Sequence, residues 1–322
     1  MHADPRRWQV GLVGYGEVGT ILAEDLRRAG VAVAAHDLKL APNAPAAGGR
    51  PLREHAAAHG VTLAASHVDL AAQADLVISA VTANQAVPVA MALAPGLRAG
   101  TWVLDLNSAS PGAKRRAAAA VEAAGGRFVE GAVMTSVPPY RIGVPLLLGG
   151  PQAAALQPGL AALGFAAAVA AQRLGVASAT KMCRSVIIKG MEAMFLESLL
   201  AARAHGVEDA VLASLAETFP GIDWDRQASY FFERVIQHGR RRAEEMGEAA
   251  ATVRELGLEP WSAAGTAQRQ AWVADLAAAG VFGAGPAGNW RTHADRVLAR
   301  VQAPVQPAAG PTGPIERRNG EP

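Results

Sequence analysis

The stretch that decides the fold is residues 10–30, VGLVGYGEVGTILAEDLRRAG, in which a short apolar run leads through three glycines into a helical pattern. Between a strand and a helix, such glycines permit a tight turn, a close approach of the backbone to a phosphate, and close packing of the helix on the strand. The free N–H groups at the start of the helix then face the phosphates. The spacing predicts a dinucleotide-binding loop made of Gly14, Tyr15, Gly16, Glu17, Val18 and Gly19.

The next apolar run, VAVAAHD at residues 31–37, ends in an aspartate, Asp37. A carboxylate at this place accepts hydrogen bonds from the ribose hydroxyls of adenosine and repels a 2′-phosphate, which favours NAD over NADP. Lys39 follows two positions later, and its positive charge keeps NADP as an alternative cofactor. The alternative is that the glycines are ordinary turn residues of an α/β domain that holds no cofactor.

Size and charge exclude several classes of protein. The chain has 322 residues, 51% of them hydrophobic, with 30 basic and 28 acidic side chains. It is long enough for two domains and lacks the basic excess of a nucleic-acid binder. The single cysteine, Cys183, excludes an internal disulfide and suits a reducing compartment. Because the chain begins without a signal-peptide pattern and has no apolar run of about 18 residues, we expect a cytoplasmic protein with no membrane partner.

Short apolar runs and alanine-rich helical segments alternate from residue 8 to about residue 172. Such runs are typical of strands buried on both faces, and their alternation with helices predicts a Rossmann-type α/β fold with a doubly wound, mostly parallel sheet. Only helical patterns follow after about residue 175, which predicts an all-α C-terminal domain. We therefore predict a dinucleotide-binding domain over 1–174, a helical substrate and dimerisation domain over 175–302, and a disordered tail, rich in Pro and Gly, over 303–322. The predicted strands are WQVGLVG, VAVAAHD, VTLA, DLVISAV, TWVLDLN, RFVEGAV and VPLLLGG.

Four stretches, in order, resemble the β-hydroxyacid dehydrogenases, which are relatives of 6-phosphogluconate dehydrogenase. Besides the glycine loop they are LDLNSASP (104–111), VEGAVMTSVPP (129–139) and GVASATKMCRS (175–185). These resemble the family's strand-end segment, its substrate-binding segment and its catalytic-lysine motif. The resemblance covers residues 8–205, and the later helices are similar to a branch whose second domain has no assigned function. It implies hydride transfer between a nicotinamide cofactor and a small hydroxy acid.

Departures from the family's pattern leave the substrate undecided. Residues 134–136 read Met-Thr-Ser where the family has Ser-Gly-Gly, and Ala177 replaces the second glycine of the lysine motif. Arg184 and Ser185 stand after the lysine, where asparagine is usual. The reaction type survives these changes, but the identity of the acid does not follow from the family.

Lys181 is the predicted acid–base residue. The resemblance implies this role, and together with the position just after the sheet domain it decides how the helical pattern is interpreted. At about 100° per residue, Lys181 shares one stripe with Ser185, Lys189 and Glu192, and Arg184 lies at its edge. A polar stripe on a largely apolar helix is costly unless it faces water, a cleft or a ligand. In a cleft, beside another cation, an amine has a lowered pKa and can take or give a proton near neutral pH; the alternative is a solvated face of spaced charges.

The remaining candidates follow predicted strand ends or lie in the helical half. Cofactor contacts are predicted from Val81, Thr82 and Asn107, with a turn or helix-cap role as the equal alternative for Asn107. Substrate contacts are predicted from Ser108, Thr135, Ser136, Arg184, Lys189 and His238.

Three further groups of residues have structural interpretations. The segment HGRRRAEEMGEAA (238–250) is by default a solvated face with ion pairs, and the alternative is that His238 and Arg241 reach an active site, either their own or that of a second subunit. Cys183 is expected in the core. No metal site is predicted, because the sequence shows no spacing with carboxylates or cysteine around His36, His55, His59 and His67.

Three functions remain open. The leading hypothesis is an NAD(P)-dependent dehydrogenase acting on the CH–OH group of a small hydroxy acid. An imine or ketone reductase on the same scaffold is weaker, because those relatives usually lack the lysine. A non-catalytic NAD(P)-binding regulator would need only the glycine loop and Asp37. The apolar runs EAMFLESLL (192–200) and SYFFERVI (229–236) predict a homodimer formed through the helical domain.

Overall fold

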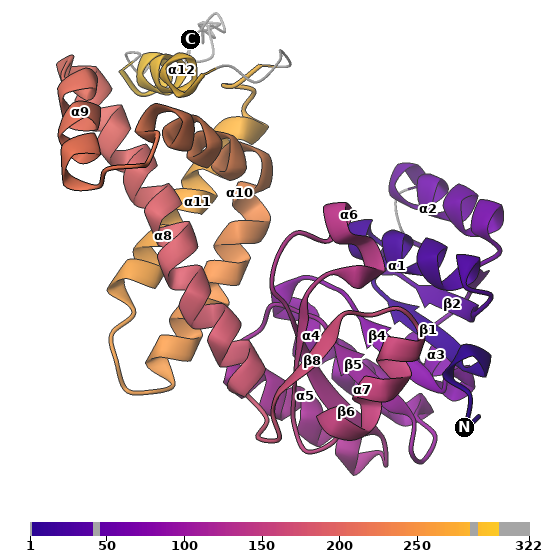
Figure 1. The fold of residues 1–322 in the computed structure, drawn as a ribbon. Helices are drawn as coiled ribbons and strands as arrows, with labels where there is room; N and C mark the ends of the chain where they lie inside the picture. Colours follow the sequence, from indigo (N-terminus) through magenta and orange to yellow (C-terminus); the bar gives the residue numbers. More distant parts are fainter. Residues whose placement is uncertain (1, 41–45, 284–288, 303–322) are drawn as a thin grey trace, which may run out of the picture.

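The computed structural model describes residues 2–40, 46–283 and 289–302. They form a sheet covered by helices, from which a long helix leads to a helical bundle (Figure 1). The predicted change to helices alone occurs between Ala171, where the last strand ends, and Val176, where the next helix begins. Whether 1–174 and 175–302 fold as separate domains stays a prediction, and the tail at 303–322 lies outside the described residues.

The sheet has eight strands in the order β3-β2-β1-β4-β5-β6-β7-β8. Strands β1 to β6 are parallel, β7 is antiparallel to β6, and β8 is parallel to β7. The order of the first six is that of the doubly wound dinucleotide fold, which confirms the predicted Rossmann-type sheet. The strands are β1 Gln9–Val13, β2 Ala32–His36, β3 Thr62–Leu63, β4 Leu76–Ser79, β5 Trp102–Asp105, β6 Arg127–Val133, β7 Leu146–Gly149 and β8 Ala167–Ala171.

Strand β8 was not among the predicted strands. Its sequence, AAVAA, has one β-branched residue, Val169, so its composition is closer to that of a helix. It lies at the edge of the sheet beside β7, and its three central residues are exposed. An edge strand with so little buried surface needs few of the side chains that mark a strand in sequence.

Both faces of the sheet are buried, which explains the continuous apolar runs. Successive residues of a strand point to opposite faces, so Leu12 packs with Leu22 and Ile78 in one core, while Val13 packs with Leu70 in the other. Helices α1, α2 and α7 contribute to the first core and α3, α4 and α5 to the second. These helices and the short α6 are α1 Glu17–Arg28, α2 Ala46–His59, α3 His67–Gln73, α4 Ala86–Leu93, α5 Pro111–Ala123, α6 Val137–Tyr140 and α7 Ala153–Ala162.

The helical half is built on two long helices, α8 and α10, which pack against each other and against α11. Its core includes Leu199, Phe232, Val273 and Trp290. Helices α9 and α12 lie at the end of the bundle that is far from the sheet (Figure 1). No helix in the described part of the chain is both long and apolar enough to cross a membrane. The helices are α8 Val176–His205, α9 Glu208–Thr218, α10 Trp224–Arg254, α11 Trp261–Ala278 and α12 Trp290–Gln302.

Candidate active site

The three glycines of the loop have different surroundings. Gly14 has a φ of +88°, and a Cβ there would lie 2.4 Å from the carbonyl oxygen of Ala80. A Cβ on Gly19 would lie 2.1 Å from the carbonyl oxygen of Gly14. A Cβ on Gly16, the N-cap of α1, would meet no described atom within 4 Å. Packing therefore requires the first and third glycines, whereas the second leaves open space at a helix N-terminus, which fits the pyrophosphate of a dinucleotide.

Replacing Gly16 by asparagine should separate binding from folding. Asparagine is a favourable N-cap residue, so we expect the thermal unfolding midpoint to be kept, while the added side chain weakens NAD binding by about tenfold or more, which is 1.4 kcal/mol. Gly19→Ala is the matched control, because its Cβ must displace backbone and should lower stability by about 1–3 kcal/mol. Calorimetric titration with NAD and thermal unfolding measure both effects. Native NAD affinity in Gly16→Asn would mean that the phosphates bind elsewhere.

Asp37 holds the loop from the end of β2. Its Oδ2 accepts the N–H of Tyr15 and its Oδ1 accepts the N–H of Lys39, both at 2.8 Å. The half-buried carboxylate keeps a further lone pair on each oxygen for a ribose hydroxyl. The side chain of Tyr15 is fully buried and its hydroxyl contacts His55 Nδ1 at 2.8 Å, so the predicted cofactor contact of Tyr15 is left to its backbone.

Asn107 stabilises the loop that follows β4. Its Oδ1 accepts the N–H of Val81 at 2.7 Å and its Nδ2 donates to Ser79 Oγ at 2.9 Å. Because Asn107 is buried and its amide is used within the protein, it corrects the prediction of a cofactor contact in favour of a turn-stabilising role. Val81 lies beside the glycine loop, where its Cγ1 would be 2.9 Å from a Cβ on Gly14. Val81 and Thr82 stay predicted cofactor contacts.

Lys181 and Ser108 meet where the two halves of the chain come together. Lys181 lies near the start of α8, and Ser108 follows β5 at the carboxyl edge of the parallel sheet, the edge that also carries the glycine loop. The Lys181 Nζ donates to Ser108 Oγ at 2.6 Å, across 73 residues of sequence. Both side chains are half-buried. The fold therefore joins the predicted acid–base residue to one of the predicted substrate residues.

The surroundings of Lys181 disfavour its charged form. The pKa of the amine is lowered from 10.5 to about 8, and burial is the largest cause of this shift. The cations of Lys189, Lys114 and Arg241 contribute to it in the same direction. The carboxylate of Glu245 acts in the opposite direction. An amine with this pKa is available in both protonation states near neutral pH, as an acid–base catalyst requires.

The polar stripe of α8 faces α10. Ser185, Lys189 and Glu192 are at most 7% exposed. Lys189 Nζ donates to Glu245 on α10, and burial lowers the pKa of this lysine while Glu245 raises it. Lys189 is thus paired within the chain, which corrects its prediction as a substrate residue. Glu245 was not predicted, although a buried lysine requires such a partner.

The arginine run at 240–242 is divided between surface and core. Arg240 pairs with Asp275 and Arg241 with Glu245, and both arginines are exposed, as the predicted solvated face requires. Arg242 is 5% exposed, and its guanidinium binds both oxygens of Glu192, with Nε to Oε2 at 2.9 Å. The prediction of a solvated face is wrong for Arg242, because the buried carboxylate on α8 needs a counter-charge.

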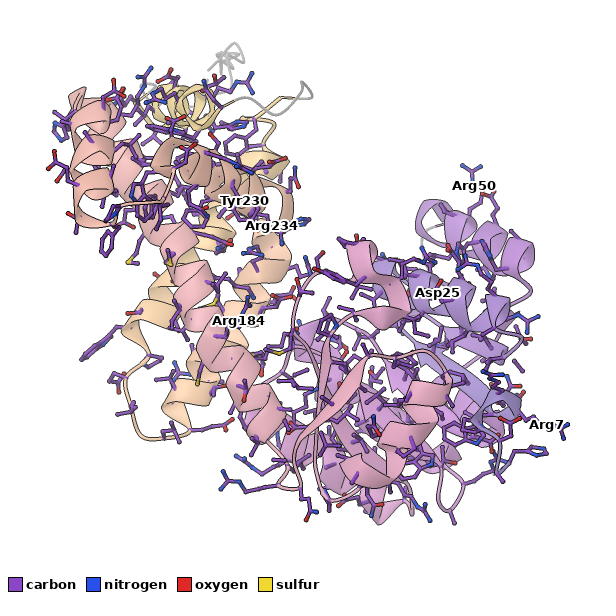
Figure 2. The ribbon with its side chains drawn as sticks, viewed as in Figure 1. Arg7, Asp25, Arg50, Arg184, Tyr230 and Arg234 are labelled. Carbon is purple, nitrogen blue, oxygen red and sulfur yellow. The ribbon has the colours of Figure 1, made fainter. Side chains whose placement is uncertain are left out.

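Helix α10 carries a cationic stripe on the side of the glycine loop. Tyr230, Arg234, His238 and Arg241 are spaced by four, four and three residues, so they share one side of the helix. Burial and the arginines lower the pKa of His238, while Glu17, in the first turn of α1, acts in the opposite direction, so this stripe lies near the loop. Figure 2 shows Tyr230 and Arg234 on the part of the bundle that faces the sheet half. The Nε of Arg234 is buried without a hydrogen-bond partner among the described residues.

The other predicted residues lie on the surface. Thr135 and Ser136 follow β6 and are exposed, as is Arg184 on α8. These three stay predicted substrate contacts. Cys183 is exposed, which corrects its prediction as a core residue. It lies about 200° around α8 from Lys181, on the side that does not face α10.

Glu130, for which no role was predicted, belongs to the site region. It is fully buried in β6 and accepts the N–H groups of Gly175 and Ala177, at 2.8 and 3.1 Å, and the hydroxyl of Ser178, at 2.8 Å. A carboxylate at the N-terminus of a helix satisfies its free N–H groups and its dipole. Glu130 therefore fixes the first turn of α8, one turn before Lys181. A lone acidic residue inside the apolar run RFVEGAV was the available signal.

Two carboxylates of α10 bind the start of α5. Glu248 accepts the N–H of Ser110 at 2.7 Å, and Glu255 accepts the N–H of Gly112 at 2.9 Å. The C-terminal part of α10 therefore returns to the sheet, so α10 runs antiparallel to α8 (Figure 1). Both helices that line the site are anchored on the sheet half.

Two families match this chain. Residues 9–171 match the family described as the NAD binding domain of 6-phosphogluconate dehydrogenase. Residues 202–273 match a domain of unknown function (DUF1932). The helical region thus resembles proteins whose second domain has no assigned role.

Solved structures extend the resemblance to both halves. A conserved hypothetical protein from Sinorhizobium meliloti 1021 is 38% identical, with 91% of this chain and 96% of that chain covered and a TM-score of 0.71. The conserved protein MTH1747, of unknown function and described as structurally similar to 3-hydroxyacid dehydrogenases, is 31% identical, with 83% and 97% covered and a TM-score of 0.64.

More distant structures share the fold alone. A 3-hydroxyisobutyrate dehydrogenase of Mycobacterium tuberculosis, solved with L-serine, is 17% identical, with 90% of this chain and 99% of that chain covered and a TM-score of 0.64. A reductive aminase from Aspergillus terreus and an imine reductase from Myxococcus stipitatus also share it, at 22% and 18% identity. The fold is thus common to hydroxyacid dehydrogenases and imine reductases, and the choice between them depends on the site.

Proposed function

The chain belongs to the family of the NAD binding domain of 6-phosphogluconate dehydrogenase, and from this we propose that it is an NAD(P)-dependent dehydrogenase acting on the CH–OH group of a small hydroxy acid. The observation that carries the proposal is the contact of 2.6 Å between Lys181 Nζ and Ser108 Oγ, at the carboxyl edge of the sheet. The nicotinamide, when bound, supplies the hydride acceptor or donor. The protein must then supply proton transfer and a place for the acid.

Lys181 carries the proton in this proposal. As a neutral amine its Nζ takes the proton of the substrate hydroxyl during oxidation, and as an ammonium it returns that proton during reduction. Ser108 accepts a hydrogen bond from Nζ, so it orients the amine and offers its own hydroxyl to the substrate oxygen. A reductase of imines lacks this need for a lysine, which favours the dehydrogenase.

The carboxylate of the acid is proposed to bind the cationic stripe of α10. Arg234 and Arg241 concentrate positive charge beside His238, whose lowered pKa favours a neutral imidazole that can still donate a hydrogen bond. The buried Nε of Arg234 offers a donor that no described group uses. Guanidinium groups bind carboxylates in two-point contacts, and Arg184 on α8 is a further predicted contact for the substrate. The substrate class is therefore an anionic hydroxy acid.

Titration with NAD and NADP, followed by an activity panel, tests the function. We expect NAD to bind more tightly than NADP, because Asp37 repels a 2′-phosphate. Nicotinamide absorbance is then followed with hydroxy acids, neutral alcohols, ketones and imines. Turnover of a hydroxy acid supports the proposal, and turnover of imines alone would assign a reductase. Cofactor binding without any turnover would assign a regulator.

The pH profile should report the amine. With a pKa of about 8, the neutral form needed for oxidation is the minor form below pH 8, so kcat/KM for oxidation should rise about tenfold per pH unit and level off above pH 8. Reduction needs the ammonium form, so its kcat/KM should fall above the same pH. Both profiles are measured in constant ionic strength buffers. An oxidation rate that stays flat from pH 6 to 9 would contradict a basic role for Lys181.

A homodimer through the helical half is proposed on the outer face of α8. Ile187 and Met194 are 65% and 63% exposed, on the side opposite the stripe of Lys181. The predicted run SYFFERVI contributes less, because Phe231 and Phe232 are buried within the chain. Tyr230 is its one exposed aromatic residue. Exposed apolar groups on one helix side are typical of interfaces. Sedimentation should give twice the mass of one chain, and Ile187→Glu with Met194→Glu should give the mass of one.

A further inference from the structure

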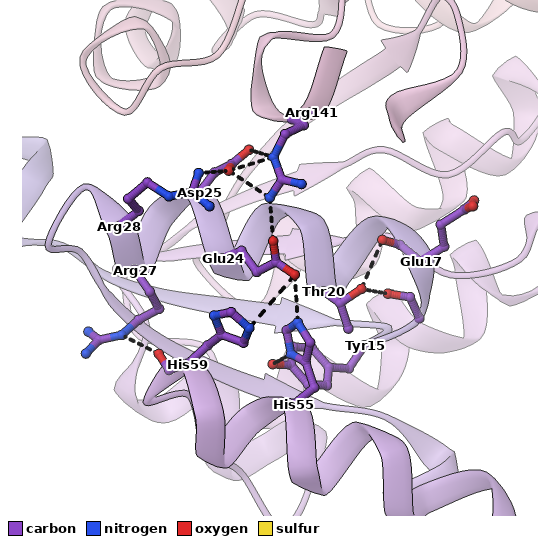
Figure 3. Close-up of polar contacts among 11 residues, drawn as sticks. Tyr15, Glu17, Thr20, Glu24, Asp25, Arg27, Arg28, His55, His59 and Arg141 are labelled. Carbon is purple, nitrogen blue, oxygen red and sulfur yellow. Dashed lines mark hydrogen bonds and ion pairs between the residues drawn. The ribbon is translucent and has the colours of Figure 1, made fainter. Parts of the chain in front are cut away.

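A cluster of histidines and a carboxylate lies beside the glycine loop, outside the proton-transfer site. His55 and His59 are one turn apart on α2, and Glu24 faces them from α1 (Figure 3). Glu24 Oε1 is 3.0 Å from His55 Nε2 and 4.0 Å from His59 Nε2. One ligand atom of each residue lies within 4.8 Å of the others. Two imidazoles and one carboxylate thus converge on a single point; we call them the histidine cluster.

The outward-facing atoms of the cluster are already held by other residues. The Nδ1 of His55 contacts the hydroxyl of Tyr15 at 2.8 Å, and Arg141 donates to Glu24 Oε2 at 2.6 Å. Metal-binding histidines and carboxylates are oriented by such partners on their far side. Arg141 also donates to Asp25, at 2.9 Å, so its positive charge is shared between two carboxylates. Arg141 contacts Oε2 of Glu24, so Oε1, which faces the imidazoles, is the oxygen that a cation would use.

The distances suit a small ion. Metal–ligand bonds of about 2.0–2.2 Å in a tetrahedral site place the ligand atoms about 3.3 Å apart. The pair of Glu24 and His55, at 3.0 Å, is near this value, whereas His59 Nε2 is 4.0 Å from Glu24 and the three ligand atoms lie within 4.8 Å of one another, so the side chain of His59 must move inward to bind the ion. The side chains of Glu24, His55 and His59 are 24%, 20% and 38% exposed, so an ion and its water molecules can enter.

We infer that Glu24, His55 and His59 form a binding site for one divalent transition-metal ion, of which Zn²⁺ is the reference. Two imidazole nitrogens with one carboxylate suit zinc, nickel, cobalt or copper, and magnesium and calcium prefer sites made of oxygen alone. The ion would join α1 to α2 and, through His55, contact Tyr15 of the glycine loop. It has no part in the proposed proton transfer. This inference departs from the sequence prediction of no metal site, which did not consider Glu24, 31 residues from His55.

Calorimetric titration of the dialysed full-length protein with ZnCl₂ tests the site. We expect one zinc ion per chain for the native protein and no binding of MgCl₂. His59→Gln is the sharpest variant, because the contact of His59 with Glu24 is 4.0 Å long and its loss should leave the fold intact. His205→Gln is the matched control, since His205 is an exposed histidine at the end of α8. Thermal unfolding without metal checks that all variants are folded.

Zinc affinity should fall by at least about tenfold in His59→Gln and in Glu24→Gln, and stay native in His205→Gln. Tyr15→Phe, which removes only the outer partner of His55, should lower it by about tenfold. Zinc should raise the thermal unfolding midpoint of the native protein and not that of His59→Gln. If native protein binds no zinc, or if His59→Gln binds it as tightly as native protein, the cluster is a hydrogen-bonded network without a metal and the inference is overturned.

Discussion

Replacing Lys181 by alanine is expected to lower kcat for oxidation of the hydroxy acid by about 10²–10⁴, the contribution of a positioned acid–base group. NAD affinity should be nearly unchanged, because the glycine loop and Asp37 do not contact Lys181 in the described structure. Absorbance of the reduced nicotinamide measures kcat, and a fluorescence titration measures cofactor binding. A small added amine such as methylamine should restore part of the rate, since it replaces the missing proton carrier.

Cys183→Ala is the control for this variant. Cys183 is two residues from Lys181 on the same helix but is exposed on another side of it, so its replacement should leave kcat and NAD affinity as in the native protein. If Lys181→Ala kept the native rate, the amine would not be the acid–base group. The chain would then remain an NAD-binding protein whose reaction is carried by other residues.

Replacing Arg242 by methionine should cause the largest loss of stability. Arg242 and Glu192 are 5% and 1% exposed, and removal of one partner leaves an uncompensated buried charge, which costs about 3–5 kcal/mol. Thermal or urea unfolding of the full-length chain measures the loss. The double variant Arg242→Met with Glu192→Leu should recover most of it, because an apolar pair of similar volume avoids the buried charge.

Arg240→Met is the matched control from the same arginine run. Arg240 and its partner Asp275 are 60% and 68% exposed, and an exposed pair contributes at most about 1 kcal/mol. A cost for Arg242→Met no greater than that for Arg240→Met would contradict the assignment of a buried ion pair. Arg240 and Arg242, two residues apart in one run, thus have very different expected effects on the free energy of unfolding.

The sheet and the glycine loop could be predicted because their signals are local. The apolar runs and the spacing of Gly14, Gly16 and Gly19 follow from the geometry of one strand, one turn and one helix. Strand β8 was missed because an edge strand of alanines lacks that local signal. The polar stripe of α8 was also visible in the periodicity of one helix, whereas the acid–base role of Lys181 stays a prediction that depends on the family resemblance.

The partners of the predicted residues could not be predicted, because they come from distant segments. Lys189 was assigned to the substrate, but Glu245, 56 residues later, binds it instead. Arg242 belongs with Glu192 at a separation of 50 residues. Asn107 and Tyr15 were assigned to the cofactor because they lie in the correct loops. Burial turns their side chains toward the protein, and one sequence does not show which way a loop residue points.

Because Glu130 of the sheet half binds the first turn of α8, the two halves of the chain contribute different parts of the site. The position of the Lys181 amine is set by a residue of the sheet, whereas the cations that would recognise the acid lie on α10. Mutations that reshape the bundle can therefore alter which acid is accepted while the reactive nitrogen stays where it is. New specificities in proteins of this architecture should accordingly arise along α10 and leave the strand that carries the glutamate unchanged.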